Sequence, residues 1–323
     1  MLMKAIAFTK YGSPDFLELK EIEKPTPNDD EVLIKVHAAS INSWDFELLS
    51  GKPFANRLMF GLLKPKIKTL GADIAGRVVA VGKNIKQFSP NDEVLGDLSG
   101  YGWGGFAEYV CTSENPLALK LKSMTFEEAA SIPQAAVLAL QGIRDKGQVQ
   151  PGQKVLINGA GGGVGTFAVQ MAKSFGAVVT GVDSTKKLDI MRSIGADHVI
   201  DYTKEDFTKN GQHYDLILDN VASRSISAIK RALGPKGIYV IIGGSTARIM
   251  QFVFLGPLIS KNGKKMGLLI YETNKDLAFI QKLVEEGKIK PVIDKCYPLK
   301  EVPDALRYFG EGRAKGKVVI TVQ

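Results

Sequence analysis

A glycine-rich turn near the middle of the chain, Gly159–Gly165, separates an apolar strand pattern from an apolar helix pattern. The strand pattern covers Lys154–Asn158 and the helix pattern covers Val164–Phe175. Glycines let the backbone turn tightly and let a pyrophosphate approach, and the start of a helix offers free N–H groups and a positive dipole end. The turn is therefore predicted to hold the pyrophosphate of a dinucleotide.

Strand and helix patterns continue to alternate after this turn. Further strands are expected at 178–182, 198–200, 214–218, 238–242 and 264–270, and helices at 186–194 and 224–233. Such alternation predicts a parallel sheet with right-handed crossovers, that is, an α/β fold with a doubly wound Rossmann sheet.

The first third of the chain is rich in strand patterns and is punctuated by glycines. Strands are expected at 4–9, 16–22, 31–39, 74–81, 93–96 and 106–112, and the late strands 293–299 and 317–322 return to this part. We therefore expect a β-rich catalytic domain of residues 1–124 and 271–323, with a dinucleotide-binding domain of residues 125–270 inserted in it. A cleft between two such domains is a natural active site.

Composition narrows the class of protein. The 323 residues carry a net charge of +8, but the lysines are scattered, so a solvated basic surface is favoured and no nucleic-acid partner is expected. The longest apolar stretch, 249–260, is too short and too interrupted to span a membrane. Only two cysteines, Cys111 and Cys296, are present, which excludes a disulfide framework and favours the cytoplasm.

Whether the dinucleotide is NAD(H) or NADP(H) depends on the residues that follow the strand expected at 178–182. Asp183, 18 residues after Gly165, can accept hydrogen bonds from a ribose diol, which favours NAD(H). Ser184 and Lys187 follow it and can hold a 2′-phosphate, which favours NADP(H). These two signals conflict, and the lysines are also typical of a solvated helix start.

Several segments together give the chain a family resemblance. They include Ile41–Asp45, Gly71–Gly76, Gly104–Val110, the glycine turn, Leu218–Val221, Gly287–Pro291 and Gly316–Ile320. Across essentially its whole length the chain resembles the medium-chain dehydrogenases/reductases of the zinc-less quinone oxidoreductase type. The resemblance implies a GroES-like catalytic domain beside the Rossmann domain, and a homodimer.

The resemblance also implies roles for particular residues. Asn42 corresponds to a family residue near the nicotinamide and the substrate, and Asp45 to the family aspartate of the same turn. Asn42 is also suited to cap a helix at 43–49, and the two roles can coexist. Lys187 and Tyr202 correspond to positions that flank the 2′-phosphate in NADPH-using relatives. Further cofactor contacts are implied for Ala160, Gly161, Gly162, Gly163, Val164, Asn220, Val221 and Gly243.

The resemblance also bears on the chemistry. In zinc alcohol dehydrogenases a cysteine ligand stands at the position of Asn42 and a His-Glu pair at Ala72-Asp73. No catalytic metal is expected here, and an alkoxide is hard to stabilise without a Lewis acid. The chain is thus expected to transfer a hydride from NADPH to a quinone or an α,β-unsaturated carbonyl.

Two other interpretations stay open. Asp183 supports an NAD(H)-dependent enzyme that resembles alcohol dehydrogenases, and the net charge of +8 supports a protein that binds NADPH or RNA without turnover. The segment from Gly51 to Lys68 is expected to be either a lid over the active site or a surface loop.

Overall fold

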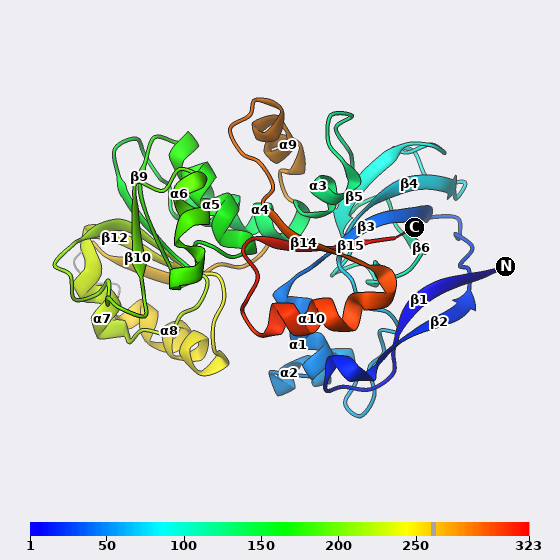
Figure 1. Ribbon diagram of the computed structural model, residues 1–323, viewed down its shortest axis with the longest axis horizontal. Coiled ribbons are helices and arrows are strands. Elements are labelled where there is room, and N and C mark those ends of the chain that lie inside the picture. The colour runs from blue at the N-terminus through cyan, green and yellow to red at the C-terminus, as the bar shows by residue number, and fades with distance from the viewer. Residues whose placement is uncertain (260–262, 323) are drawn as a thin grey trace. The chain divides into compact units, whose positions relative to one another are not determined.

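The computed structural model describes residues 1–259 and 263–322 (Figure 1). The chain forms two compact units. Unit 1 comprises residues 1–134, 273–281 and 293–323, and unit 2 comprises residues 135–272 and 282–292. Each unit has its own strands and its own buried apolar side chains, so each is described by itself.

Unit 2 is built on a six-stranded parallel sheet with the strand order β10-β9-β8-β11-β12-β13. Its strands are β8 (Lys154–Asn158), β9 (Val178–Asp183), β10 (His198–Asp201), β11 (Tyr214–Asp219), β12 (Leu233–Ile241) and β13 (Lys265–Leu268). Its helices are α5 (Gly163–Ser174), α6 (Leu188–Ser193), α7 (Ile226–Ala232) and α8 (Thr246–Ile259). The chain passes between the units four times: within α4 (Pro133–Leu140), after residue 272, within α9 (Leu277–Glu285) and after residue 292.

The strand order reverses at β8, which is the first strand of this sheet along the chain. From β8 the chain moves outward through β9 and β10, and then crosses to β11, β12 and β13 on the other side. Helices α5 and α6 lie on one face and α7 and α8 on the other (Figure 1). Val155, Leu156 and Ile157 of β8 are fully buried, as expected for a strand covered on both faces. The predicted doubly wound parallel sheet is confirmed.

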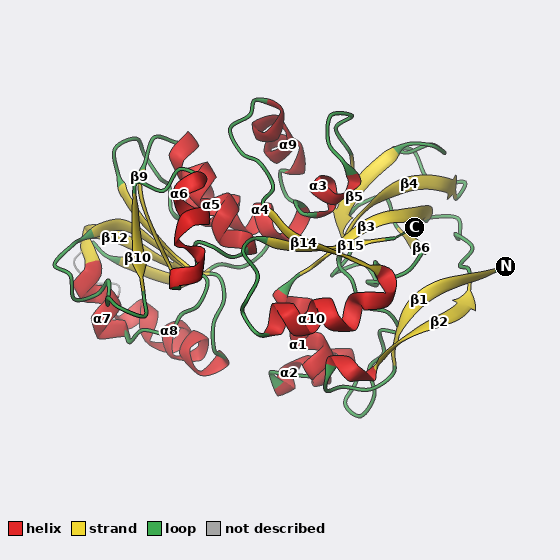
Figure 2. Cartoon of the chain, viewed as in Figure 1, coloured by secondary structure: helices red, strands yellow, loops and turns green. Residues whose placement is uncertain are grey.

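Unit 1 is dominated by antiparallel strands (Figure 2). Its strands are β1 (Leu2–Phe8), β2 (Leu17–Glu23), β3 (Val32–Ile41), β4 (Asp73–Val81), β5 (Glu93–Asp97), β6 (Tyr109–Thr112), β7 (Leu117–Leu119), β14 (Ile293–Pro298) and β15 (Lys317–Thr321). Its helices are α1 (Ser43–Ser50), α2 (Phe54–Phe60), α3 (Phe126–Ala130) and α10 (Val302–Gly310). β1 pairs with β2, and the other strands form one sheet in which β3 is central.

The sheet of unit 1 brings distant parts of the chain together at one end of β3. Ser40 of β3 lies opposite Asp73 of β4 and Val319 of β15, and Ile41 lies opposite Val318. Helix α1 begins immediately after β3. This pairing therefore places the start of α1, the start of β4 and the start of β15 side by side.

Two local differences from the sequence expectation have physical explanations. The segment 51–68, expected as a loop or lid, contains the helix α2, whose residues include few strong turn formers. The helix expected to run from Pro133 to Arg144 changes at Gln141 into a π-helical stretch that ends at Lys146. There a Cβ on Gly142 would lie 2.6 Å from Leu218 Cδ1, so the helix approaches β11 closely.

Two glycines of the central turn give a matched stability test. A Cβ at Gly165 would lie 2.1 Å from Gly159 O, whereas a Cβ at Gly162 meets its nearest atom at 3.5 Å. We expect Gly165→Ala to lower the free energy of unfolding by about 2 kcal/mol, because α5 must move away from the turn. Gly162→Ala is the control and should leave it nearly unchanged. Equal stabilities of the two variants in urea titrations would contradict this packing.

Candidate active site

The glycine turn is fixed to the end of the neighbouring strand. The N–H groups of Gly159 and Ala160 both donate to Val182 O of β9, at 2.9 and 3.1 Å. Gly159 has φ 79°, a backbone conformation that glycine adopts without strain. Gly162 is the N-cap of α5, so Gly163 and Val164 form the first turn of a 12-residue helix. The N–H groups of that first turn have no partner within the helix and offer an anion site.

The glycines of the turn permit different close contacts. A Cβ at Gly161 would lie 2.7 Å from Lys187 Cβ, so this glycine lets the third residue of the following 3₁₀ turn come close. Gly165 permits the contact between α5 and the turn. A Cβ at Gly162 would meet its nearest atom, Gly159 O, at 3.5 Å, so this glycine leaves the space that an approaching phosphate needs.

A buried carboxylate connects the strand ends beneath the turn. Asp219, at the end of β11, accepts a hydrogen bond from Asn158 Nδ2 at 2.8 Å and one from the hydroxyl of Tyr239 at 2.9 Å. It also accepts the N–H groups of Val221 and Ala222. Burial, together with this carboxylate, raises the pKa of Tyr239. These contacts hold the ends of β8, β11 and β12 in one arrangement.

The expected cofactor residues after β11 and β12 lie beside the turn. The N–H and Nδ2 of Asn220 both donate to Asn158 O, at 3.1 and 2.9 Å. A Cβ at Gly243 would lie 3.0 Å from Asn220 O, and one at Gly159 would lie 3.2 Å from Val221 Cγ2. Asn220 Oδ1 is buried without a hydrogen-bond partner, which leaves it available as an acceptor.

The four residues that distinguish the two dinucleotides also come together. The Asp183 carboxylate accepts the N–H of Gly161 at 3.0 Å and that of Ser184 at 2.8 Å. Lys187 Nζ lies 3.8 Å from the same carboxylate. The N–H of Tyr202 donates to Asp183 O, and the Tyr202 side chain is half exposed. An acidic and a basic group thus stand side by side at the edge of the turn.

In unit 1 the start of α1 is organised by a buried aspartate. Asp45 is fully buried and accepts the backbone N–H of Asn42 and that of Gly71, each at 2.9 Å. Burial raises the pKa of Asp45 to about 7, although the two N–H groups and Lys317 act in the opposite direction. This aspartate positions the backbone at Asn42 from within the core.

The side chain of Asn42 is held by a lysine from the last strand. Lys317 Nζ donates to Asn42 Oδ1 at 2.6 Å and to Ile41 O at 3.3 Å, and it lies 3.5 Å from Asp73 Oδ2. Both charged side chains are almost completely buried. Asn42 Nδ2 is buried without a hydrogen-bond partner. Lys317 therefore occupies one end of the amide and leaves the other end unsatisfied.

The buried cluster of unit 1 contains more acidic groups than basic ones. Asp45, Asp73 and Asp97 are all fully buried near the single ammonium of Lys317. Asp73 also accepts the hydroxyl of Ser40 at 3.2 Å and the N–H of Gln134 at 3.1 Å. Burial raises the pKa of Asp73 and lowers that of Lys317.

Sequence reasoning gave no supporting function to the buried polar residues Asn158, Asp73, Asp219, Tyr239 and Lys317. A lysine at the start of the apolar run Val318–Ile320 is itself unusual, because lysine is rarely buried. Asp73, just before another apolar run, carries the same signal. Charged residues at the ends of buried strands could have suggested that the two meet.

No group of three or more His, Cys, Asp or Glu side chains in residues 1–259 and 263–322 is arranged to hold a metal ion. At Asn42 and Asp73 the structure instead places the ammonium group of Lys317. A cationic side chain between these two groups disfavours a second cation there by like-charge repulsion.

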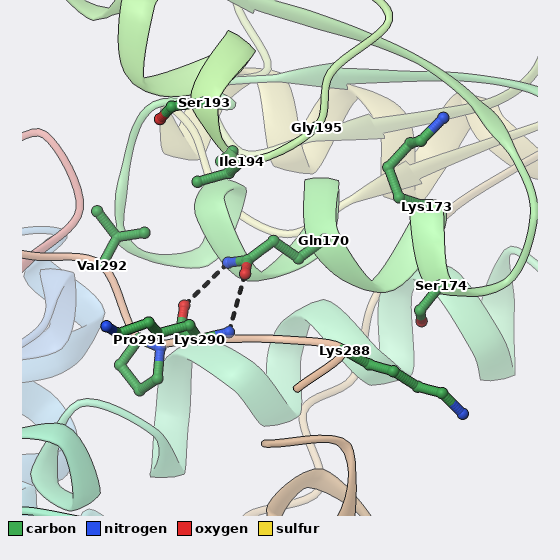
Figure 3. A pocket seen from close by; sticks show the side chains of 10 residues that line it. All are labelled: Gln170, Lys173, Ser174, Ser193, Ile194, Gly195, Lys288, Lys290, Pro291 and Val292. Carbon is green, nitrogen blue, oxygen red and sulfur yellow. Dashed lines mark hydrogen bonds between the residues drawn. The ribbon is translucent and has the colours of Figure 1, made fainter. Parts of the chain in front are cut away.

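A surface hollow of about 550 Å³ in unit 2 lies outside this set of residues (Figure 3). It is lined by residues of α5, of the end of α6 and of the 288–292 segment, and none of the expected cofactor residues is among them. The amide of Gln170 donates to Lys290 O at 3.0 Å and accepts its N–H at 2.8 Å. These two bonds hold the 288–292 segment on α5, which is a structural function.

Comparisons with known proteins identify the family. The family described as "Alcohol dehydrogenase GroES-like domain" matches residues 28–122, and the one described as "Zinc-binding dehydrogenase" matches residues 194–320. The chain is 36% identical to the 2-methylene-furan-3-one reductase of Solanum lycopersicum, over 98% of this chain and 79% of the relative.

Solved structures agree. The quinone oxidoreductase from Coxiella burnetii superposes with a TM-score of 0.89 at 30% identity and covers 100% of both chains. A structure described as an NAD-dependent alcohol dehydrogenase gives a TM-score of 0.85 at 30% identity, over 99% of this chain and 100% of the other. The chain therefore belongs to the medium-chain dehydrogenase/reductase superfamily and is quinone oxidoreductase-like, as the sequence motifs predicted. It is an oxidoreductase of that family, with a nicotinamide cofactor.

Lys317 provides a test of the buried cluster. We expect Lys317→Met to lower the free energy of unfolding by about 3 kcal/mol, since it leaves buried carboxylates without their cation. Without Lys317 these carboxyls bind a proton more tightly in the folded than in the unfolded chain, so stability falls as the pH rises through their folded pKa values. The loss should therefore be larger at pH 8 than at pH 5 in urea titrations.

The double variant Lys317→Met/Asp73→Asn is the control. It removes one uncompensated carboxylate together with the cation, and it should recover part of the lost stability at high pH. A loss of stability that is the same at both pH values, with no recovery in the double variant, would contradict a coupled buried pair.

Proposed function

We propose that this protein is a metal-independent reductase that transfers a hydride from NADPH to a quinone or an α,β-unsaturated carbonyl. The observation that carries the proposal is the Lys317 ammonium, bonded to Asn42 Oδ1 at 2.6 Å and 3.5 Å from Asp73. Asn42 and Asp73 stand at positions where zinc alcohol dehydrogenases carry the cysteine ligand and the glutamate of the His-Glu pair. An amide, a carboxylate and an ammonium form a poor donor set for zinc.

A site without a Lewis acid suits some substrates better than others. Oxidation of a simple alcohol passes through alkoxide character that a metal normally stabilises. The activated carbon of an enone, or a quinone, accepts a hydride more readily, because the negative charge spreads onto a conjugated oxygen. The names of the Solanum lycopersicum and Coxiella burnetii relatives, a 2-methylene-furan-3-one reductase and a quinone oxidoreductase, support this substrate class.

In unit 2 we assign cofactor binding to the turn and the strand ends around it. The first N–H groups of α5, with the open space at Gly162, would hold the pyrophosphate. Ser184, Lys187 and Tyr202 would surround the 2′-phosphate of the adenosine ribose, and Asn220, Val221 and Gly243 would contact the nicotinamide half. Bound in this way, the reduced nicotinamide supplies the hydride.

In unit 1 we assign Asn42 and Asp45 to the catalytic part of the site. Because Lys317 occupies Oδ1 of Asn42, the Nδ2 end is left to donate to a substrate carbonyl or to a ribose hydroxyl. Asp45 acts through the backbone of Asn42, which it holds at 2.9 Å. Trp44, two residues after Asn42, is half exposed, and its ring stacks on that of Trp103 with 6.4 Å between the ring centroids, so it offers a flat apolar surface. The proton that completes the reduction would come from water.

The wider assignments are part of the same proposal. Residues 1–124 and 271–323 would form the catalytic domain and residues 125–270 the dinucleotide domain. A homodimer is part of the same proposal, as the family resemblance implies. The free cysteines Cys111 and Cys296 support a reducing compartment such as the cytoplasm. No helix among the described residues has the length and apolarity needed to cross a bilayer.

One observation favours a second candidate, an NAD(H)-dependent enzyme similar to alcohol dehydrogenases. Asp183 stands at the end of β9, where a carboxylate can bind a ribose diol. Against this candidate, the Asp183 carboxylate already accepts two backbone N–H groups and has Lys187 beside it. Because these contacts already occupy the Asp183 carboxylate, it is less able to bind a ribose diol, whereas Lys187 can still bind a 2′-phosphate.

Dissociation constants measure the cofactor preference directly. We expect NADPH to bind more tightly than NADH in a fluorescence titration. Lys187→Met should weaken NADPH binding by roughly tenfold and leave NADH binding nearly unchanged, since it removes a charge-assisted contact to the phosphate. Lys186→Met is the matched control, because Lys186 is the exposed neighbour. Equal effects of Lys187→Met on both dinucleotides would contradict the NADPH assignment.

The reaction is tested by mixing enzyme, NADPH and an acceptor in a stopped-flow instrument. We expect turnover with phenanthrenequinone or with a conjugated alkenal, and none with a saturated alcohol and NADP⁺. Asn42→Ala should reduce kcat by roughly 100-fold, the loss typical of one oriented donor. Asn84→Ala removes an exposed asparagine of the same unit and is the control. Failure to reduce either acceptor would exclude the proposed reaction.

A further inference from the structure

The segment that follows α1 carries an unusual row of exposed apolar side chains. Phe54, Leu58, Met59, Leu62 and Leu63, called here the apolar ridge, are 61%, 66%, 68%, 52% and 86% exposed. Ten residues thus place five large apolar side chains in solvent. A concentration of this kind is typical of an interaction site rather than of a bare surface.

The same segment is strongly basic. Between Gly51 and Ala72 the chain contains Lys52, Arg57, Lys64, Lys66 and Lys68 and no aspartate or glutamate. The four lysines, called here the basic rim, are exposed. No ion pair joins any of them to a carboxylate among the residues that the structure describes. Their charges are therefore available to an external anionic partner.

The ridge is held in an ordered conformation from beneath. The Tyr11 hydroxyl donates to Gly61 O at 2.7 Å, and the Arg57 guanidinium lies over the Tyr11 ring at 4.8 Å. Phe60 and Ile67 pack against the core of unit 1. Because these contacts point one side of the segment inward, the apolar ridge is turned outward by the fold.

We infer that the apolar ridge and the basic rim dock the protein on an anionic lipid surface. Apolar side chains on a short helix and its following loop can enter the headgroup region, while lysines around them meet the lipid phosphates. A second copy of the chain fits this surface less well. A twofold contact would bring two lysine-rich rims against each other with no carboxylate between them. This inference does not depend on the proposed reaction.

Vesicle sedimentation with the full chain tests the inference. We expect the protein to sediment with vesicles of mixed phosphatidylcholine and phosphatidylglycerol, not with phosphatidylcholine alone, and to be released by high salt. Lys64→Gln/Lys66→Gln/Lys68→Gln should weaken binding roughly 100-fold, because each lysine near an anionic surface contributes about fivefold. Leu58→Gln/Met59→Gln/Leu63→Gln should abolish sedimentation, because it removes the apolar side chains that would enter the headgroup region.

A control triple variant separates local from general charge effects. Lys236→Gln/Lys265→Gln/Lys300→Gln removes the same charge at exposed sites elsewhere and should keep its binding. Circular dichroism and thermal unfolding establish that each variant is folded. The inference is overturned if the protein does not bind anionic vesicles, or if the two triple variants of the segment bind as the wild type does. It is equally overturned if the apolar variant only converts a dimer to a monomer in light scattering, or only changes KM.

Discussion

The burial of one lysine among carboxylates governs the catalytic part of unit 1. Lys317 is carried into the core by the pairing of β15 with β3, and there it meets Asn42 at 2.6 Å and Asp73 at 3.5 Å. Neither charge could remain in that place alone, because an unpaired buried ion is strongly unfavourable. Lys317, Asp73 and the start of α1 therefore have to be placed together. The orientation of the Asn42 amide, and with it the chemistry assigned to this unit, depends on that arrangement.

In unit 2 a single buried carboxylate, that of Asp219, holds the strand ends together. Asp219 is fully buried at the end of β11, and its oxygens accept hydrogen bonds from Asn158, Tyr239 and two backbone N–H groups. These donors come from β8, from β12 and from the loop after β11, so one buried group aligns the strand ends on which the glycine turn rests. In both units a polar group buried at a strand end positions the residues that we assign to cofactor or substrate binding. The apolar strands around this group form a rigid frame.

Much of the local structure was predictable, because the signals are short in range. The strand at 154–158, the glycine turn and the helix after it follow from residues that are neighbours in sequence, and the structure places them within a residue or two of the expected limits. Helix α2 was not predicted, since three of its four large apolar side chains, those of Phe54, Leu58 and Met59, face solvent and do not form a buried stripe. Strand β7 and helix α10 were not identified either. β7 has only three residues, whereas the buried Val302, Ala305 and Leu306 of α10 have a helical spacing that could have indicated it.

The sequence by itself determined the family, the doubly wound sheet and the turn suited to a dinucleotide. Glycine freedom, strand periodicity and helix starts act over a few residues, so they can be followed along the chain. The tertiary structure decided which distant groups share a buried environment: Lys317 with Asn42, 275 positions apart, and Asp183 with the N–H of Gly161. Such pairs are set by strand register and by the high free energy of an unsatisfied buried charge, and neither of these is visible in a single linear sequence.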